Sequence, residues 1–252
     1  MGKNMNNIKI LTTFRNCEKF LERSLTSIFA QDYKNFKILL VNDASEDNSD
    51  AICQKFINQY PDQIIYTKNE DRKYALYNQQ RAVFDHTEPE DIVVTVDGDD
   101  FFSSVDALSY VNDFYTKENC LVTYGQYQHL NGNRGQPRPF HSEEEFNNLR
   151  SIPFFVSHLR TFKAKVFHEI KNQDPELSCM KNEHGNWYRI GCDMVFCLPL
   201  LEIAGYDKVK YIDKVLYIYN HHQHSDDRIH GEEQVKTDRE CRTKNKFHKK
   251  EF

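Results

Sequence analysis

Three carboxylates stand at the end of one strongly apolar stretch of the chain. Residues 92–96 read Ile-Val-Val-Thr-Val, and they run directly into Asp97, Gly98, Asp99 and Asp100. A short β-branched run of this kind predicts a buried strand, and Gly98 would let the chain turn at its end. Carboxylate oxygens such as those of Asp97 and Asp99 are the donors that hard divalent cations prefer. The pattern indicates a metal or ligand site, although a polar loop that caps the next helix would have the same composition.

The elements that must position these acids alternate between strand and helix. Strands are expected at 8–14, 36–41, 64–66 and 92–96, and helices at 17–30, from residue 49 onward and at 75–84. Alternation on this scale is typical of βαβ units in a parallel sheet. Right-handed crossovers place the strand-end loops on one edge of such a sheet. Residues 12–15, 43–47 and 97–100 should therefore meet in one crevice.

Length and composition exclude several classes of protein. The chain has 252 residues, 39% of them apolar and 28% charged, which suffices for one large domain with a substantial core. A net charge of −5 argues against a general polyanion or nucleic-acid binder. We find neither an apolar run long enough to span a membrane nor the apolar core of a signal peptide. The seven cysteines include no Cys-x-x-Cys pair, so we expect free thiols, no structural zinc and a cytoplasmic location.

Four motifs in the N-terminal half resemble those of a known family. They are Thr-Thr-Phe-Arg-Asn at 12–16, Ser-Ile-x-x-Gln-x-Tyr-x-Asn at 27–35, Val-Asn-Asp-x-Ser-x-Asp at 41–47 and Asp-Gly-Asp-Asp at 97–100. In this order they resemble the family 2 glycosyltransferases, closely over residues 8–102 and loosely beyond. The resemblance implies an α/β fold of the GT-A type, a Rossmann-like, mostly parallel central sheet flanked by helices, with a smaller acceptor-side C-terminal part. It also implies a nucleotide-diphosphate sugar as donor.

The resemblance assigns donor-binding roles to several of these residues. Asp43 would contact the nucleoside, with Thr12 and Phe14 lining the same pocket. Asp97 would hold the ribose or the metal, and Asp99 the metal itself. Carboxylate ligands favour Mn²⁺ or Mg²⁺, which would screen the charge of the diphosphate as it leaves.

One part of the donor region departs from the family pattern. Relatives have a glycine and then Ala-Arg-Asn before the third helix, whereas residues 72–78 here read Arg-Lys-Tyr-Ala-Leu-Tyr-Asn. Arg72 is therefore either a donor contact or a solvated surface cation. We expect Asp100 to support the loop, by capping the helix that begins near Ser103 or Ser104.

The C-terminal half supplies candidate catalytic and acceptor residues. Gly-Cys-Asp at 191–193 opens an apolar helix, and the resemblance implies that Asp193 is the catalytic base, with partial burial raising its pKa. A simple helix cap is the alternative. Trp187 would pack on an acceptor sugar or in the core, and His158 and Arg160 would contact phosphate or sugar, or would be structural.

Two histidines lie near the end of the chain. His222 fits the position of a family Tyr-x-x-His tail and His224 is the next candidate; each would be a further metal ligand or part of a surface loop. We expect residues 1–227 to form one domain, with a nucleotide-sugar half (1–102) and an acceptor half (103–227). Residues 228–252 are highly charged and predict a solvated helix or a frayed tail.

These features predict a metal-dependent glycosyltransferase that moves one hexose from a UDP-sugar to a hydroxyl of a glycan or a protein-linked acceptor. No nucleic-acid partner and no membrane span are expected, and inversion or retention stays open. One rival is a sugar-phosphate nucleotidyltransferase, which usually has a glycine-rich loop after its first strand; residues 12–17 contain no glycine. The other rival is a catalytically inactive carbohydrate-binding relative, which would not be expected to keep all the aspartates named above.

Overall fold

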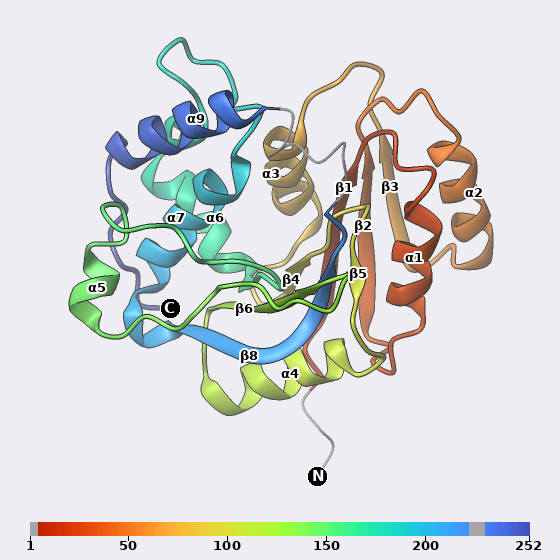
Figure 1. Ribbon diagram of the computed structural model, residues 1–252, viewed down its shortest axis with the longest axis horizontal. Helices are drawn as coiled ribbons and strands as arrows, with labels where there is room; N and C mark the ends of the chain where they lie inside the picture. The colour runs from red at the N-terminus through yellow and green to blue at the C-terminus, as the bar shows by residue number, and fades with distance from the viewer. Residues whose placement is uncertain (1–4, 222–229) are drawn as a thin grey trace.

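The first half of the chain builds a parallel sheet with a helix after each strand. The computed structural model describes residues 5–221 and 230–252. The elements follow in the order β1 (Ile8–Phe14), α1 (Leu21–Phe29), β2 (Phe36–Asn42), α2 (Ser49–Gln59), β3 (Ile64–Lys68), α3 (Ala75–His86) and β4 (Ile92–Thr95). Strands β3, β2, β1 and β4 lie side by side, and all three pairings are parallel (Figure 1). The predicted alternation of strands and helices is confirmed.

The second half extends this sheet with strands of both directions. Its elements are β5 (Phe101–Phe102), α4 (Ala107–Glu118), β6 (Val122–His129), α5 (Glu143–Asn147), β7 (Thr161–Lys163), α6 (Ala164–Gln173), η1 (Ser178–Met180), α7 (Cys192–Ala204), η2 (Tyr206–Lys208), β8 (Val209–Tyr219) and α9 (Gly231–Thr243). The full order across the eight-stranded sheet is β3-β2-β1-β4-β7-β6-β8-β5. Strand β7 is antiparallel to both β4 and β6, whereas β6 and β8 are parallel. The fold is thus a mixed, mostly parallel sheet with helices on both sides, as expected.

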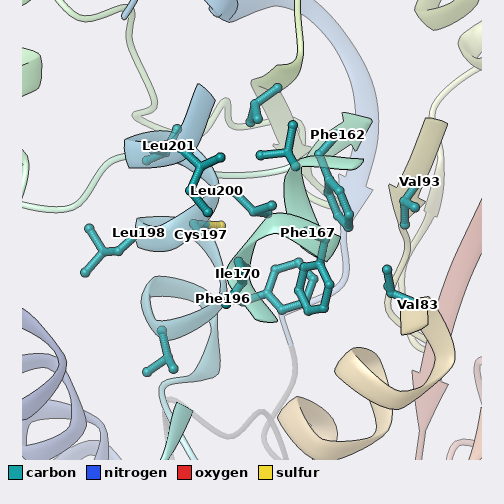
Figure 2. Packing of buried hydrophobic residues seen from close by; sticks show 14 of the residues in the cluster. Val83, Val93, Phe162, Phe167, Ile170, Phe196, Cys197, Leu198, Leu200 and Leu201 are labelled. Atoms are coloured by element: carbon teal, nitrogen blue, oxygen red, sulfur yellow. The ribbon is translucent and has the colours of Figure 1, made fainter. Parts of the chain in front are cut away.

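Two apolar cores cover the two faces of the sheet. Side chains alternate across a strand, so Ile38 of β2 lies in one core and its neighbour Leu39 in the other. Helices α1, α2 and α4 cover the first face, and α3, α6 and α7 the second. Figure 2 shows the second core, where Phe167 of α6 packs on Phe196 of α7 with ring centroids 5.0 Å apart. In the described part of the chain no helix is long and apolar enough to cross a membrane.

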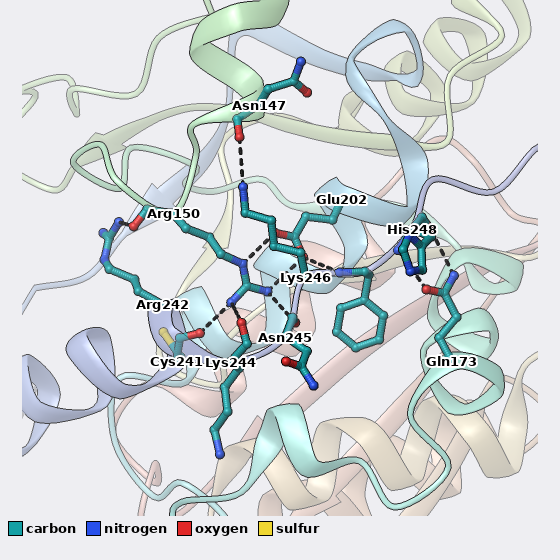
Figure 3. A network of polar contacts seen from close by, with 11 residues as sticks. Asn147, Arg150, Gln173, Glu202, Cys241, Arg242, Lys244, Asn245, Lys246 and His248 are labelled. Atoms are coloured by element: carbon teal, nitrogen blue, oxygen red, sulfur yellow. Dashed lines mark hydrogen bonds and ion pairs between the residues drawn. The ribbon is translucent and has the colours of Figure 1, made fainter.

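The charged C-terminal segment forms a mostly exposed helix, one of the two forms expected, and this helix also packs against the domain. Helix α9 contacts α7, and its residue Cys241 is buried. The guanidinium group of Arg150 donates to the backbone carbonyls of Cys241 at 2.7 Å and Lys244 at 3.1 Å, while two further bonds of 2.6 and 2.8 Å hold it to the carboxylate of Glu202 (Figure 3). Glu202 also accepts the backbone N–H of Phe247. A buried ion pair thus satisfies the carbonyls at the end of α9.

Candidate active site

The loops that follow β1 and β2 are tied together at the C-terminal edge of the sheet. The backbone N–H of Asp43 donates to the carbonyl of Phe14 at 2.9 Å. The side chain of Arg15 donates to the carbonyls of Asp43 and Ala44 and pairs with Glu46. The predicted meeting of residues 12–15 with residues 43–47 is therefore present.

The Asp-Gly-Asp-Asp loop sits directly on the end of β1. A Cβ atom at Gly98 would lie 2.5 Å from the Cβ of Phe14. Gly98 does not adopt a positive φ, so it is needed for space and not for the turn that the sequence suggested. Phe14 is 5% exposed and Thr12 is fully buried, so neither side chain faces solvent at this edge of the sheet.

Asp100 anchors the Asp-Gly-Asp-Asp loop to the C-terminal end of β8. Its carboxylate accepts the hydroxyl of Tyr217 and the backbone N–H of Asn220, each at 2.7 Å. The same tyrosine hydroxyl accepts the backbone N–H of Asp97, and the amide of Asn220 donates to the carbonyl of Asp99. Asp100 therefore supports the loop, but through β8 and not by capping the helix that follows.

Strand β7 brings His158 and Arg160 to the same edge. Because β7 is antiparallel to β4, the residues before β7 lie beside the C-terminal end of β4, and the backbone N–H of Thr95 donates to the carbonyl of Arg160. One ligand atom each from Asp97, Asp100 and His158 lie within 4.8 Å of one another. The expected Asp97 is part of this group; Asp99, the other expected ligand, is not. His222 and His224 lie outside the described residues.

Burial and neighbouring charges shift the pKa values of Asp97, Asp100 and His158. Burial, followed by the charges of Asp193 and Asp99, raises the pKa of Asp97 to about 7. Burial, followed by the charges of Asp99 and Asp97, raises the pKa of Asp100 well above its usual range. Burial and the charge of Arg160 lower the pKa of His158 to about 3, so its imidazole is neutral at physiological pH. A neutral imidazole and crowded carboxylates are a donor set that a cation would stabilise.

Asp193 forms an ion pair with Arg160, which corrects the expectation of a raised pKa. The two guanidinium nitrogens of Arg160 contact the two carboxylate oxygens of Asp193 at 3.0 and 2.6 Å. Partial loss of hydration acts to raise the pKa of Asp193, but the charge and hydrogen bonds of Arg160, together with the charge of His158, hold that pKa below its ordinary value. The Asp193 side chain is 58% exposed, whereas that of Arg160 is 11% exposed. The carboxylate of Asp193 is therefore ionised, and the less exposed guanidinium group of Arg160 holds it in place.

Asp43 organises the segment before α3. Its carboxylate accepts the side-chain amide of Asn69 at 2.8 Å and the backbone N–H groups of Lys73 at 2.7 Å and Tyr74 at 2.8 Å. Burial opposes these bonds, yet together they hold the pKa of Asp43 below its ordinary value. The carboxylate is thus occupied by the protein itself, and it shapes the loop over which a nucleoside would lie.

Two arginines meet at Tyr74 on this loop. Arg72 lies 4.2 Å and Arg189 5.0 Å from the centre of the Tyr74 ring. Both arginines are exposed, and Tyr74 has a φ of 68°. Arg189 lies just before Gly191, the residue that precedes α7, so the contact joins the predicted nucleotide side to the acceptor side. The sequence indicated Arg72 alone, and nothing in its spacing pointed to Arg189.

Trp187 is half-buried next to the same region. Its ring meets Tyr77 of α3 edge-on at 5.4 Å, and the ammonium group of Lys181 lies 5.3 Å from it. These contacts fix the indole between α3 and the segment before α7, with part of its surface still accessible.

Comparison with known proteins decides the family. Residues 9–171 match the sequence model of glycosyl transferase family 2. The chain belongs to glycosyl transferase family 2. Among the relatives of this family 2 glycosyltransferase is the glycosyltransferase GlyA of Streptococcus pneumoniae, 25% identical over 232 residues that cover 84% of this chain and 30% of the relative.

Other relatives match at similar levels. The putative glycosyltransferase EpsE of Bacillus subtilis is 30% identical over 93 residues, 37% of this chain and 33% of the relative. The teichoic acid poly(glycerol phosphate) polymerase of Staphylococcus epidermidis is 22% identical over 222 residues, 86% of this chain and 28% of the relative. This glycosyltransferase chain thus spans about a third or less of the length of each of these relatives.

Solved structures share its fold. Residues 1–349 of Staphylococcus aureus TarS in complex with UDP superpose with a TM-score of 0.63 at 17% identity, covering 86% of this chain and 61% of that TarS fragment. The mannosyltransferase PcManGT of Pyrobaculum calidifontis, in complex with GDP-Man and Mn²⁺, gives a TM-score of 0.60 at 16% identity, covering 87% of this chain and 58% of PcManGT. The GT-A fold expected from the sequence is confirmed.

The residues of this glycosyltransferase fit a divalent cation. Two carboxylates and an imidazole converge within one ion's reach, and no hydrogen bond joins the ring nitrogens of His158 to any described residue. Oxygen donors with one imidazole suit Mn²⁺ and related ions. Tyr217, which holds Asp100, and the place of His158 beside Asp97 were not foreseen, because neither follows from spacing along the chain.

Proposed function

We propose that this glycosyltransferase moves one hexose from a UDP-sugar to an acceptor hydroxyl, with Mn²⁺ or Mg²⁺ at the diphosphate. One observation carries the proposal: the cluster of Asp97, Asp100 and His158 lies next to the ion pair of Arg160 and Asp193. The charge of Asp193 is close enough to raise the pKa of Asp97. In this proposal the metal ion and the catalytic base would therefore be adjacent.

The donor would lie along the C-terminal edge of β1, β2 and β4. Asp43 and the loop that it holds would contact the nucleoside, with Arg72 beside it and Thr12 and Phe14 packed beneath. The UDP and UDP-GlcNAc complexes of TarS support UDP as the nucleotide, and the GDP-Man complex of PcManGT makes GDP the alternative.

The metal end would act on the leaving group. Asp97 and Asp99 of the Asp-x-Asp motif would bind the metal ion and the donor, and His222 or His224 would be a further metal ligand. The Mn²⁺ complex of PcManGT supports a divalent cation. A cation held by these residues supplies charge neutralisation for the departing diphosphate.

Asp193 would be the base of an inverting transfer. Its carboxylate accepts the proton of the acceptor hydroxyl while that oxygen forms a bond to the anomeric carbon. The bond from the anomeric carbon to the diphosphate oxygen breaks, and its electron pair leaves with UDP. Arg160 keeps the carboxylate ionised and oriented, so most of the rate would come from positioning and not from a strongly basic group.

The acceptor would approach over α7. Trp187 is placed to pack on a sugar ring, and the exposed Arg189 to meet an anionic group. Because one relative is named for poly(glycerol phosphate), we propose a phosphate-bearing glycan or polyol as the acceptor class. Neutral glycans and glycosylated proteins are the alternatives.

The test measures the release of UDP or GDP from a panel of UDP- and GDP-sugars with Mn²⁺, with and without acceptors of each class. Asp99→Asn is expected to abolish metal-dependent UDP binding, whereas Asp193→Asn should keep UDP binding and lose transfer. Absence of both turnover and nucleotide binding in the wild-type chain would refute the proposal. Nucleotide binding without turnover on any acceptor would favour an inactive carbohydrate-binding protein.

A further inference from the structure

A polar cavity lies at the edge of the sheet opposite to the candidate active site. Its volume is about 230 Å³, and its lining includes Asn6, Tyr115, Asn119 and Lys163. Lys163 ends β7 and pairs with Ile92, the first residue of β4, whereas the acidic loop follows the other end of β4. A cavity of this size can hold several waters or a small ligand. None of the residues assigned to sugar transfer lines it.

Lys163 brings a buried positive charge to this cavity. The residue is 9% exposed, and lysine is rarely buried to this degree unless it is paired. Its ammonium group donates to the side-chain carbonyl of Asn6 at 3.0 Å and to the backbone carbonyl of Glu90 at 2.7 Å, and both of these residues line the cavity. An ammonium group has three donors, so one N–H of Lys163 has no hydrogen-bond acceptor in the described part of the chain.

The carboxylate of Glu90 is a weak counter-ion for this lysine. One of its oxygens lies 3.8 Å from the ammonium group of Lys163, beyond hydrogen-bond distance. The other oxygen accepts the ammonium group of Lys165 at 2.8 Å, and the Glu90 side chain is 72% exposed. Two lysines therefore share one carboxylate that solvent screens.

Asp91, the other carboxylate that acts on Lys163, is engaged elsewhere. It accepts the side-chain amide of Asn7 at 2.6 Å and lies 3.7 Å from the ammonium group of Lys9. Burial lowers the pKa of Lys163 even though the charges of Glu90 and Asp91 act to raise it. The charge of Lys163 is thus only partly balanced by the protein.

The rim of the cavity is polar and reachable from solvent. Thr116 of α4 and Asn119, the residue after Glu118 at the end of α4, are exposed and line the cavity together with Lys165. The lining therefore carries two ammonium groups and the single carboxylate of Glu90. Carbonyls at the C-terminal end of a helix repel anions, but the carbonyl of Asn119 accepts the ammonium group of Lys208 at 3.2 Å.

We propose that this cavity is a second ligand site, which binds a small oxyanion, a phosphate or a carboxylate group, with Lys163 as its counter-ion. The remaining N–H of Lys163 donates to the oxyanion, and Lys165 and the side-chain amide of Asn119 supply further donors from the rim. The oxyanion balances the buried charge that the protein leaves partly unpaired. The site is separate from the transfer site and does not rest on the proposed function.

The experiment titrates the full chain, without nucleotide or metal, with inorganic phosphate and separately with acetate, by isothermal titration calorimetry. The wild-type chain should bind at least one of the two anions, and the tighter of them identifies the oxyanion that the cavity takes. Lys163→Met should bind it at least about tenfold more weakly, because the charged donor is gone. Lys55→Met, which removes an exposed lysine paired with Glu22, is the matched control and should bind as the wild type does.

A second variant leaves Lys163 and the buried wall of the cavity intact. Thr116→Glu adds a carboxylate at an exposed helical position on the rim, and its charge should weaken oxyanion binding. Gln59→Glu adds the same charge at an exposed position of α2 and should leave the affinity unchanged. Thr116→Glu also decides the outcome where Lys163→Met is not folded by near-ultraviolet circular dichroism.

The outcomes separate this cavity from the candidate active site. Weaker binding in the folded cavity variants, with both controls unchanged, supports the second site whether or not the chain transfers sugar. Binding of neither anion by the wild-type chain, or unchanged affinity in Lys163→Met and Thr116→Glu, overturns it. Affinity that is lost in Arg72→Met instead would place the anion at the candidate active site and would also overturn it.

Discussion

Arg160 and Asp193 are joined by two hydrogen bonds, of 3.0 and 2.6 Å, in the candidate active site. Arg160 is the residue directly before β7, and Asp193 lies in the first turn of α7. The buried member of the pair is the cation, and the exposed member is the carboxylate. The arrangement presents an ionised, fixed acid to anything that enters from solvent.

Replacing the cation should change the pH dependence of transfer. In Arg160→Met the charge and the hydrogen bonds that lower the pKa of Asp193 are gone, so the pKa should rise. The acid limb of the kcat/KM profile should then move to higher pH, because the carboxylate must be ionised to accept a proton. Arg160→Lys should restore part of the wild-type profile. Arg81→Met, which removes an exposed pair with Asp85, is the control, and an unshifted acid limb in Arg160→Met would contradict the assignment.

Gly98 should not tolerate a methyl group. Gly98→Ala would place Cβ 2.5 Å from the Cβ of Phe14, and neither backbone can give way without moving the acidic loop. We expect a loss of about 1–3 kcal/mol in the free energy of unfolding and weaker Mn²⁺-dependent binding of UDP. Urea denaturation and UDP titration measure the two effects. Gly231→Ala is the control, since no atom lies within 4 Å of its Cβ position; equal stability of the two variants would refute the steric argument.

The acid sensitivity of the fold should depend on Asp43. Its folded pKa is lowered, so its contribution to stability is complete above an unfolded value of about 3.9 and is lost as pH falls through the folded pKa. Asp43→Asn should cost about 1–3 kcal/mol near pH 7, because a buried acceptor of three hydrogen bonds is replaced. The difference from wild type should shrink as pH falls below about 4. Denaturation from pH 3 to 7, with the exposed Asp71→Asn as the charge control, tests this; a difference that does not vary with pH would count against it.

The C-terminal segment should loosen when its buried ion pair is broken. The side chains of Arg150 and Glu202 are 6% and 7% exposed, so Arg150→Met leaves a buried carboxylate without its partner. We expect a loss of about 3–5 kcal/mol and faster proteolysis within residues 231–252. The double variant Arg150→Met, Glu202→Leu should recover part of the stability, because no uncompensated charge remains although the carbonyls of Cys241 and Lys244 and the N–H of Phe247 still lack their partners. Equal instability of the single and double variants would mean that packing, and not charge, holds the segment.

The sequence by itself determined the N-terminal framework and the edge where chemistry occurs. The strands at 8–14, 36–42 and 92–95 are apolar on both faces because helices cover both faces, and this pattern is local and readable. Once such strands are parallel, their C-terminal ends must share an edge. The placement of Asp43 and Asp97 together followed from that geometry.

Only the tertiary structure decided which partners those acids have. His158 and Arg160 reach Asp97 and Asp193 because β7 inserts antiparallel between β4 and β6, an arrangement that hydrophobic periodicity does not encode. Tyr217 meets Asp100 across 117 positions of sequence because β8 pairs antiparallel with β5, where Tyr217 lies opposite Phe102. The pKa of Asp193 and the packing of the charged tail likewise depend on buried cations, Arg160 and Arg150, whose burial comes from distant segments. Composition and spacing indicate the local preference for helix or strand, whereas these contacts form only when segments that are distant in sequence pack together.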